Sequence, residues 1–115
     1  MNEIQLQYVK NVISRKKRQL YQELSFFMLV KNYSPDKQCE VVLSGEDGQW
    51  SSLPALYHST IDLDKECWHA HIILTGNITK SIPGNIKFAL RYQVEGKEYW
   101  DNNHGLNYSS QADSG

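Results

Sequence analysis

Alternation of apolar and polar residues dominates this chain and predicts β-strands. Between residues 86 and 94 every second side chain is apolar, and most of those between are polar, which is typical of a strand with one buried face. Residues 20–30 and 67–74 show the same period, and residues 4–9 and 38–43 are further strand candidates. Helix formers occur within residues 10–24, but no stretch of ten or more residues shows a convincing helical period.

Clusters of Gly, Pro, Asn, Asp and Ser separate these segments at residues 32–36, 44–48 and 81–85. Seven or eight short strands joined by such turns predict an all-β fold, an antiparallel β-sandwich. We expect one domain over residues 1–108, followed by a flexible C-terminal tail at 109–115, because that segment is small and polar.

Charge and hydropathy exclude several classes of protein. The 115 residues include 12 basic and 13 acidic side chains, whereas a general nucleic-acid binder needs a basic surplus. The longest apolar run, residues 26–30, is too short to cross a bilayer, and no signal-peptide pattern opens the sequence. The basic run at residues 15–18 could contact nucleic acid or anionic lipid, but the balanced total charge favours a solvated loop. We therefore expect a cytoplasmic location, with no nucleic-acid and no membrane partner.

Cysteine and histidine give a weak metal signal. Cys67, His69 and His71 share one face of a predicted strand, and His58 would supply a fourth ligand. This spacing is common by chance, so we expect no metal and no cofactor. Cys39 and the other cysteine are expected to be small buried or half-buried residues, and their redox state is left open.

The most distinctive segment, residues 99–108, reads YWDNNHGLNY. Asn side chains pair a donor with an acceptor in one plane, which suits vicinal hydroxyls, and Trp offers a flat apolar face that suits a sugar ring. One interpretation is a neutral glycan site, and the other is an Asn- and Gly-rich hairpin loop with core aromatics at its ends. Carboxylates at Glu95, Glu98 and Asp101 flank a turn without separating an acid from a base, so we do not expect an enzyme.

Residues 99–108 resemble the signature end of carbohydrate-binding module family 21, which includes fungal starch-binding domains and the glycogen-targeting subunits of protein phosphatase 1. Residues 86–97 resemble the strand and turn that precede this signature in the family. Further similarities are the Val-Lys-Asn segment at residues 30–32, Lys37, Trp50 and Trp68. The resemblance covers residues 4–108.

The resemblance implies an eight-stranded, immunoglobulin-like sandwich that binds α-1,4-glucans such as starch, glycogen or malto-oligosaccharides without catalysis. It implies one site with two stacking platforms and several hydrogen-bonding or loop-holding residues. The carbohydrate-binding residues would be Trp50, Trp100, Asn32, Lys37, Asp101, Asn102 and Asn107. The partners implied are an α-glucan and an attached enzyme or phosphatase. The alternative is a protein-interaction or phosphatase-targeting scaffold domain of the same fold.

Some positions depart from the family pattern. Pro35 and Lys65 stand where some members carry aromatics of a second site, which argues against a second site here. Ala89 replaces an aromatic that some members add to the first site. Which glucan is preferred, whether the chain is a whole protein, and its oligomeric state are left open by the sequence.

Overall fold

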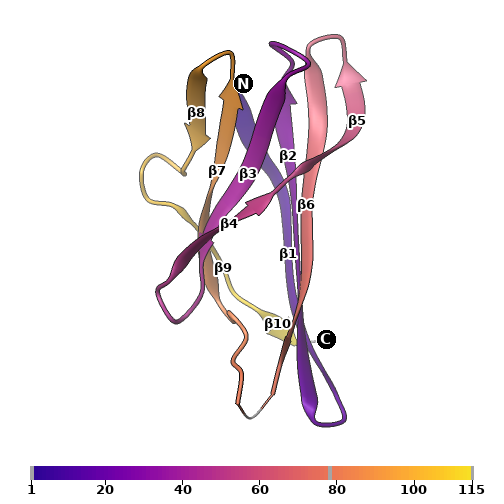
Figure 1. Ribbon diagram of the computed structural model, residues 1–115, viewed down its shortest axis with the longest axis vertical. Coiled ribbons are helices and arrows are strands. Elements are labelled where there is room, and N and C mark those ends of the chain that lie inside the picture. Colours follow the sequence, from indigo (N-terminus) through magenta and orange to yellow (C-terminus); the bar gives the residue numbers. More distant parts are fainter. Residues whose placement is uncertain (1, 78, 115) are drawn as a thin grey trace.

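The computed structural model describes residues 2–77 and 79–114, and these residues form a two-layered β-sandwich (Figure 1). No helix long and apolar enough to span a membrane occurs in this part of the chain. The described strands are β1 (Ile4–Lys16), β2 (Gln19–Lys31), β3 (Lys37–Ser44), β4 (Trp50–Pro54), β5 (Leu56–Asp62), β6 (Lys65–Gly76), β7 (Ile86–Val94), β8 (Lys97–Asp101), β9 (Tyr108–Ser110) and β10 (Asp113–Ser114).

The two sheets have the orders β10-β1-β2-β6-β5 and β4-β3-β7-β8, and β9 pairs with the far end of β7. Each described pairing is antiparallel except the short one between β1 and β10. The predicted antiparallel, immunoglobulin-like sandwich is confirmed. Its eight strands of five or more residues are β1 to β8, and β9 and β10 are short additions.

The core lies between the sheets and is built from the alternating apolar positions. In β7 the five alternate residues from Ile86 to Val94 are at most 4% exposed, and in β2 Leu24, Phe26, Met28 and Val30 are fully buried. Burial of each large apolar side chain contributes about 1.5–3 kcal/mol relative to exposure. Residues 10–24 belong to the β1–β2 hairpin, so the helix formers there lie in its two strands and its turn.

The chain passes from one sheet to the other between β4 and β5. β4 is an edge strand of its sheet and β5 is an edge strand of the other, and Ala55 alone separates them. Ala55 is 5% exposed, and its N–H donates a hydrogen bond of 2.8 Å to the carbonyl oxygen of Cys39 in β3. A single buried residue therefore links the two layers.

A buried amide cluster joins the β1–β2 hairpin to the β6–β7 loop. Gln22, fully buried in β2, donates from Nε2 to Asn11 Oδ1 and to the carbonyl oxygen of Gly84, both at 2.7 Å. The Gly84 N–H in turn donates to Gln22 Oε1 at 2.8 Å. These bonds attach the β6–β7 loop to the first sheet, and the positive φ of 71° at Gly84 allows its backbone to turn there.

The C-terminal segment is paired with both sheets. The sequence placed the domain boundary at residue 108, but β9 continues to Ser110 because its backbone pairs with β7. Beyond it, the Ala112 N–H donates to Asn85 Oδ1 at 2.9 Å, and Asp113 pairs with Val12 of β1. The boundary at residue 108 therefore falls inside a strand, whereas the flexibility expected for residues 109–115 stays a prediction.

Candidate functional site

Two exposed tryptophans lie on the outer face of the β4-β3-β7-β8 sheet, the face turned away from the core. Arg91 of β7 pairs with Trp100 of β8, and Ser44 of β3 pairs with Trp50 of β4. Glu40, which pairs with Arg91, is four residues before Ser44 on β3. Because alternate residues of a strand point to the same side, both tryptophans share this face.

Trp100 is held by a charged neighbour. Its side chain is 42% exposed, and the Arg91 guanidinium carbon lies 5.6 Å from the ring centroid, a cation–π contact worth about 0.5–1 kcal/mol at exposed sites. Arg91 also forms ion pairs with Glu40 and, at 3.5 Å, with Glu98. This network fixes the guanidinium against the indole, and it therefore restricts the orientation of the ring.

Trp50 is 52% exposed and lies at the start of β4. Across the sheet, β3 and β7 lie between Trp50 on β4 and Trp100 on β8, so the two residues are three strand spacings apart. Along the strand direction, their positions differ by four residues. With about 4.8 Å between strands and about 3.3 Å per residue, the two Cα atoms are roughly 20 Å apart. Val42 and Ala89, which pair with each other between them, are small side chains on the same face. The outer face thus presents two exposed indoles that are separated by small side chains.

A polar groove lies beside Trp100. Its volume is about 520 Å³, and amide residues from two segments of the chain, the N-terminal segment and the 102–107 loop, contribute to its walls. Its lining residues are Asn2, Glu3, Gln5, Trp100, Asp101, Asn102, Asn103, His104 and Tyr108. Amides present both donors and acceptors without a net charge, so this groove suits a neutral ligand rich in hydroxyl groups.

The asparagines of the 102–107 loop also shape the backbone. Asn102 Oδ1 accepts from the Gly105 N–H at 2.9 Å, and the Asn102 carbonyl oxygen accepts from the Asn107 N–H at 2.8 Å. Positive φ angles occur at Asn103 (53°), His104 (57°), Gly105 (87°) and Asn107 (60°). Asn tolerates this left-handed conformation better than most residues. The hairpin-loop interpretation of this segment therefore accounts for part of its composition, and Asn107 holds the loop through its backbone.

Asp101 points into the protein beneath the groove. Its side chain accepts from the Leu6 N–H at 2.8 Å and from the Tyr108 hydroxyl at 2.8 and 2.9 Å, and the residue is 7% exposed. Burial, together with the hydrogen bond and the charge of this carboxylate, raises the pKa of Tyr108 to about 12. Asp101 thus joins β8 to β1 and β9, and it supports the groove from below.

Asn32 and Lys37 lie elsewhere, at the end of the sandwich where β3 begins. The Lys37 amine contacts Asn32 Oδ1 at 2.7 Å, the carbonyl oxygen of Ser34 at 2.6 Å and Glu66 Oε1 at 3.1 Å, and its side chain is 3% exposed. It also lies 6.0 Å from the ring centroid of Trp68. The seven predicted residues therefore do not form one constellation, because this buried ion pair draws Asn32 and Lys37 away from the outer face.

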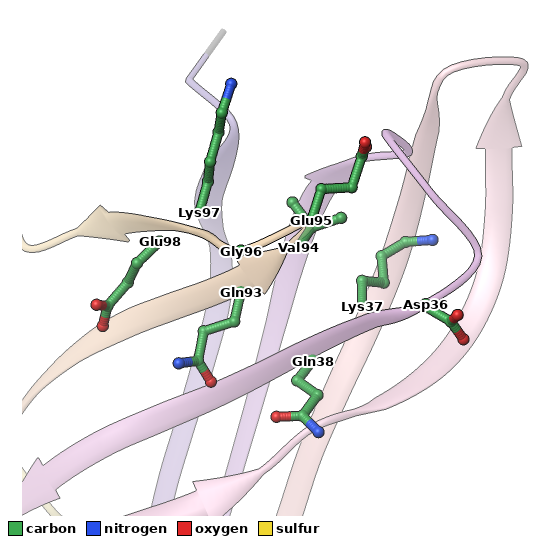
Figure 2. Close-up of a pocket in the computed structure, with 9 residues that line it drawn as sticks. All are labelled: Asp36, Lys37, Gln38, Gln93, Val94, Glu95, Gly96, Lys97 and Glu98. Atoms are coloured by element: carbon green, nitrogen blue, oxygen red, sulfur yellow. The ribbon is translucent and has the colours of Figure 1, made fainter.

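A second hollow of about 540 Å³ borders the outer face at the β7–β8 turn (Figure 2). Gln38, Gln93 and Glu98 pair across β3, β7 and β8 and extend the face beyond Trp100. Figure 2 shows the Lys37 amine directed away from Gln93 and Glu98. The sequence reasoning did not select Gln38, Gln93 or Arg91, although strand parity alone places Gln93 and Arg91 on the polar face.

Three of the four histidines, His58, His69 and His71, lie on the outer face of the other sheet. His71 Nε2 is 3.0 Å from Glu23 Oε2, and the His69 ring stacks on Phe27 with centroids 4.1 Å apart. Burial and the neighbouring histidines lower the pKa of His69. Within residues 2–77 and 79–114, no group of three or more His, Cys, Asp or Glu side chains is placed to hold a metal ion. Cys39 and Cys67 are free thiols.

Comparison with known proteins supports the resemblance seen in the sequence. A protein-family model described as carbohydrate/starch-binding module (family 21) matches residues 1–111. No curated protein matches the chain in a sequence search.

Three solved structures share the fold. The starch-binding domain of Rhizopus oryzae glucoamylase, studied with beta-cyclodextrin and maltoheptaose, is 21% identical, with a TM-score of 0.67 over 96% of this chain and 94% of that chain. The carbohydrate-binding module of the muscle glycogen-targeting subunit of protein phosphatase-1 is 19% identical, with a TM-score of 0.67 over 97% and 77%. A cyclomaltodextrinase is 10% identical, with a TM-score of 0.59 over 95% of this chain and 19% of that chain.

Proposed function

This chain belongs to the carbohydrate/starch-binding module family 21, and on that premise we propose that it binds α-1,4-glucan, such as starch or glycogen, through the outer face of the β4-β3-β7-β8 sheet. The observation that carries this proposal is the half-exposed indole of Trp100 beside the amide-lined groove. The indole would stack on the apolar face of a glucose ring, and the amides would bind its hydroxyl groups.

Trp100 and Asn102 are the main contacts in this proposal, and Trp50 is a second platform. Because the two indoles are roughly 20 Å apart by strand spacing, a single sugar ring cannot reach both, whereas an extended oligosaccharide can. Occupation of the second platform by the same chain benefits from a high effective concentration. Longer malto-oligosaccharides are therefore expected to bind more tightly than maltose.

The other predicted residues have supporting roles in the proposal. Asp101 and Asn107 hold the 101–108 segment in shape through the hydrogen bonds described above. Lys37 binds both Asn32 and Glu66 at the end of the sandwich, so the proposal assigns Lys37 and Asn32 no sugar contact on the outer face. Direct contact with glucan is assigned to Trp50, Trp100 and the groove amides.

We further propose that the module is not an enzyme. Glu98 pairs with Arg91, and Asp101 is bound by two internal donors, so neither is a free acid or base. Glu3 then remains as a single further carboxylate at the groove, whereas glycoside hydrolysis uses a positioned pair. Two structural relatives are named as parts of a glucoamylase and of a phosphatase-targeting subunit. By analogy, the role of this module would be to bring an attached or associated enzyme or phosphatase to a glucan polymer.

Calorimetric titration with maltoheptaose tests the proposal. Trp100→Ala should weaken binding at least about tenfold, the equivalent of about 1.4 kcal/mol. Tyr8→Ala is the matched control, because Tyr8 is 56% exposed on the other sheet, and this variant should bind like the wild type. Circular dichroism checks that both variants fold. The proposal fails if the wild type binds neither maltoheptaose nor glycogen, or if folded Trp100→Ala binds unchanged.

A further inference from the structure

The β1–β2 hairpin carries a concentrated positive charge. Between Glu3 and Glu23 the sequence has five basic residues and no acidic residue. Four of the five, Arg15, Lys16, Lys17 and Arg18, are consecutive, exposed and located at the turn of the hairpin. We call these four residues the basic tip. Within the described residues, none of the four forms an ion pair.

The basic tip projects from one end of the molecule. The protein is 47 Å long, and Figure 1 shows the β1–β2 turn at the lower end of the long axis, with the N-terminus and the β7–β8 turn at the upper end. The β6–β7 loop reaches toward the same lower end and brings Lys80. No acidic residue occurs between Glu66 and Glu95. The hairpin tip and the β6–β7 loop are therefore both free of carboxylates, whereas β10 brings Asp113 toward this end.

The rest of the protein does not neutralise the basic tip. Glu23, the nearest carboxylate on the hairpin, lies opposite Val12, which is three residues from Arg15 and so about 10 Å along the strand from it, and Glu23 already pairs with Lys10 and His71. Asp113 pairs with Val12, so it lies about 10 Å along the strand from Arg15. Both separations exceed the screening length of about 8 Å at physiological salt. The balanced total charge of the protein therefore does not describe the local positive charge at this end.

The arrangement of the four cations favours a surface over a linear polymer. Successive residues near the end of a strand point to opposite sides, so Arg15 and Lys16 lie on opposite faces of the ribbon. A nucleic-acid backbone running along one face would meet only some of these charges. A fluid lipid surface that meets the turn end-on can place mobile headgroups under all four.

We propose that the basic tip is an electrostatic docking site for an anionic lipid surface. The sequence-based expectation of no membrane partner rested on the lack of a long apolar run and on the balanced total charge, and neither describes the local charge at this end. The proposal concerns contact at the headgroup level and does not depend on glucan binding. Figure 1 shows β8 in the half of the molecule away from the β1–β2 turn, so a membrane at the tip leaves this half open to a glucan chain.

Co-sedimentation with vesicles tests the proposal. Vesicles of phosphatidylcholine alone are compared with vesicles that contain about 30% phosphatidylserine, a composition that gives a negative surface potential. The wild type should bind only the anionic vesicles and should be released when salt is raised from about 0.1 M to about 1 M, because the screening length falls from about 10 to about 3 Å. A basic residue near such a surface changes binding about fivefold.

The double variant Lys16→Gln/Arg18→Gln should therefore bind anionic vesicles about 30-fold more weakly. The control, Lys87→Gln/Lys97→Gln, removes the same charge from exposed positions outside the tip and should bind like the wild type. The proposal is overturned if the wild type ignores anionic vesicles, or if both double variants lose binding equally. Binding to a duplex oligonucleotide but not to vesicles would also overturn it and would identify the tip as a nucleic-acid contact.

Discussion

Replacement of Asp101 distinguishes a structural carboxylate from a sugar-binding one. In Asp101→Ala, the Leu6 N–H and the Tyr108 hydroxyl lose their acceptor. A hydrogen bond to a charged group contributes about 1.5–3 kcal/mol, and both donors are left in a largely buried place. We therefore expect the free energy of unfolding to fall by about 3–5 kcal/mol, a large part of the usual total of about 5–15 kcal/mol.

Urea unfolding followed by tryptophan fluorescence measures this change. Asn102→Ala is the neighbouring control: its side-chain oxygen accepts from one exposed loop amide, so it should cost about 1 kcal/mol or less. Asp101→Asn keeps one acceptor oxygen, so its free energy of unfolding should lie between those of the wild type and Asp101→Ala. This second variant can be compared with the wild type even if the alanine variant does not fold. If Asp101→Ala unfolds at the wild-type urea concentration while its affinity for maltoheptaose drops, the carboxylate contacts sugar and the structural reasoning is wrong.

Two further predictions concern the core. Gln22→Ala removes three buried hydrogen bonds, so it should lower the free energy of unfolding by about 3 kcal/mol in urea titrations, whereas exposed Gln38→Ala should change it little. Burial raises the pKa of both Tyr92 and Tyr108 to about 12, above the unfolded value near 10. The stability that the two protonated tyrosines contribute is therefore complete below about pH 10 and is lost as the pH rises toward 12. The urea midpoint of the wild type should fall over this pH range. The midpoint of a variant with both tyrosines replaced by Phe should fall less steeply.

Much of the fold could be predicted from residue parity alone. The alternation correctly indicates buried residues in β2 (Phe26, Met28) and in β7 (Phe88, Leu90). In a strand with one solvent-exposed face, buried side chains must recur at every second residue. The polar residue Gln22 breaks this rule. It shares the buried parity, and two of its three hydrogen bonds are with the backbone of Gly84, 62 residues away, which no local pattern reveals.

The candidate site was predictable only in part, for the same reason. Trp100 and Asn102 stand out as an aromatic beside an amide in a turn-rich segment. The inward orientation of Asp101 depends on Leu6, 95 residues away, and that of Lys37 depends on Glu66 in the opposite sheet. The family resemblance suggested sugar contacts or a loop-holding role at both positions, whereas long-range pairing uses both charges inside the protein.

The single buried residue between β4 and β5 has a consequence for how the module opens. An edge strand often separates from its sheet first, since it has one neighbour only. Here, β4 is joined to β5 through Ala55 alone, so separation of β4 from its sheet displaces Ala55 and strains the pairing of β5 in the other sheet. The two layers should therefore exchange their amide hydrogens as one cooperative unit, and a module anchored to a bulky polymer would resist piecemeal unravelling.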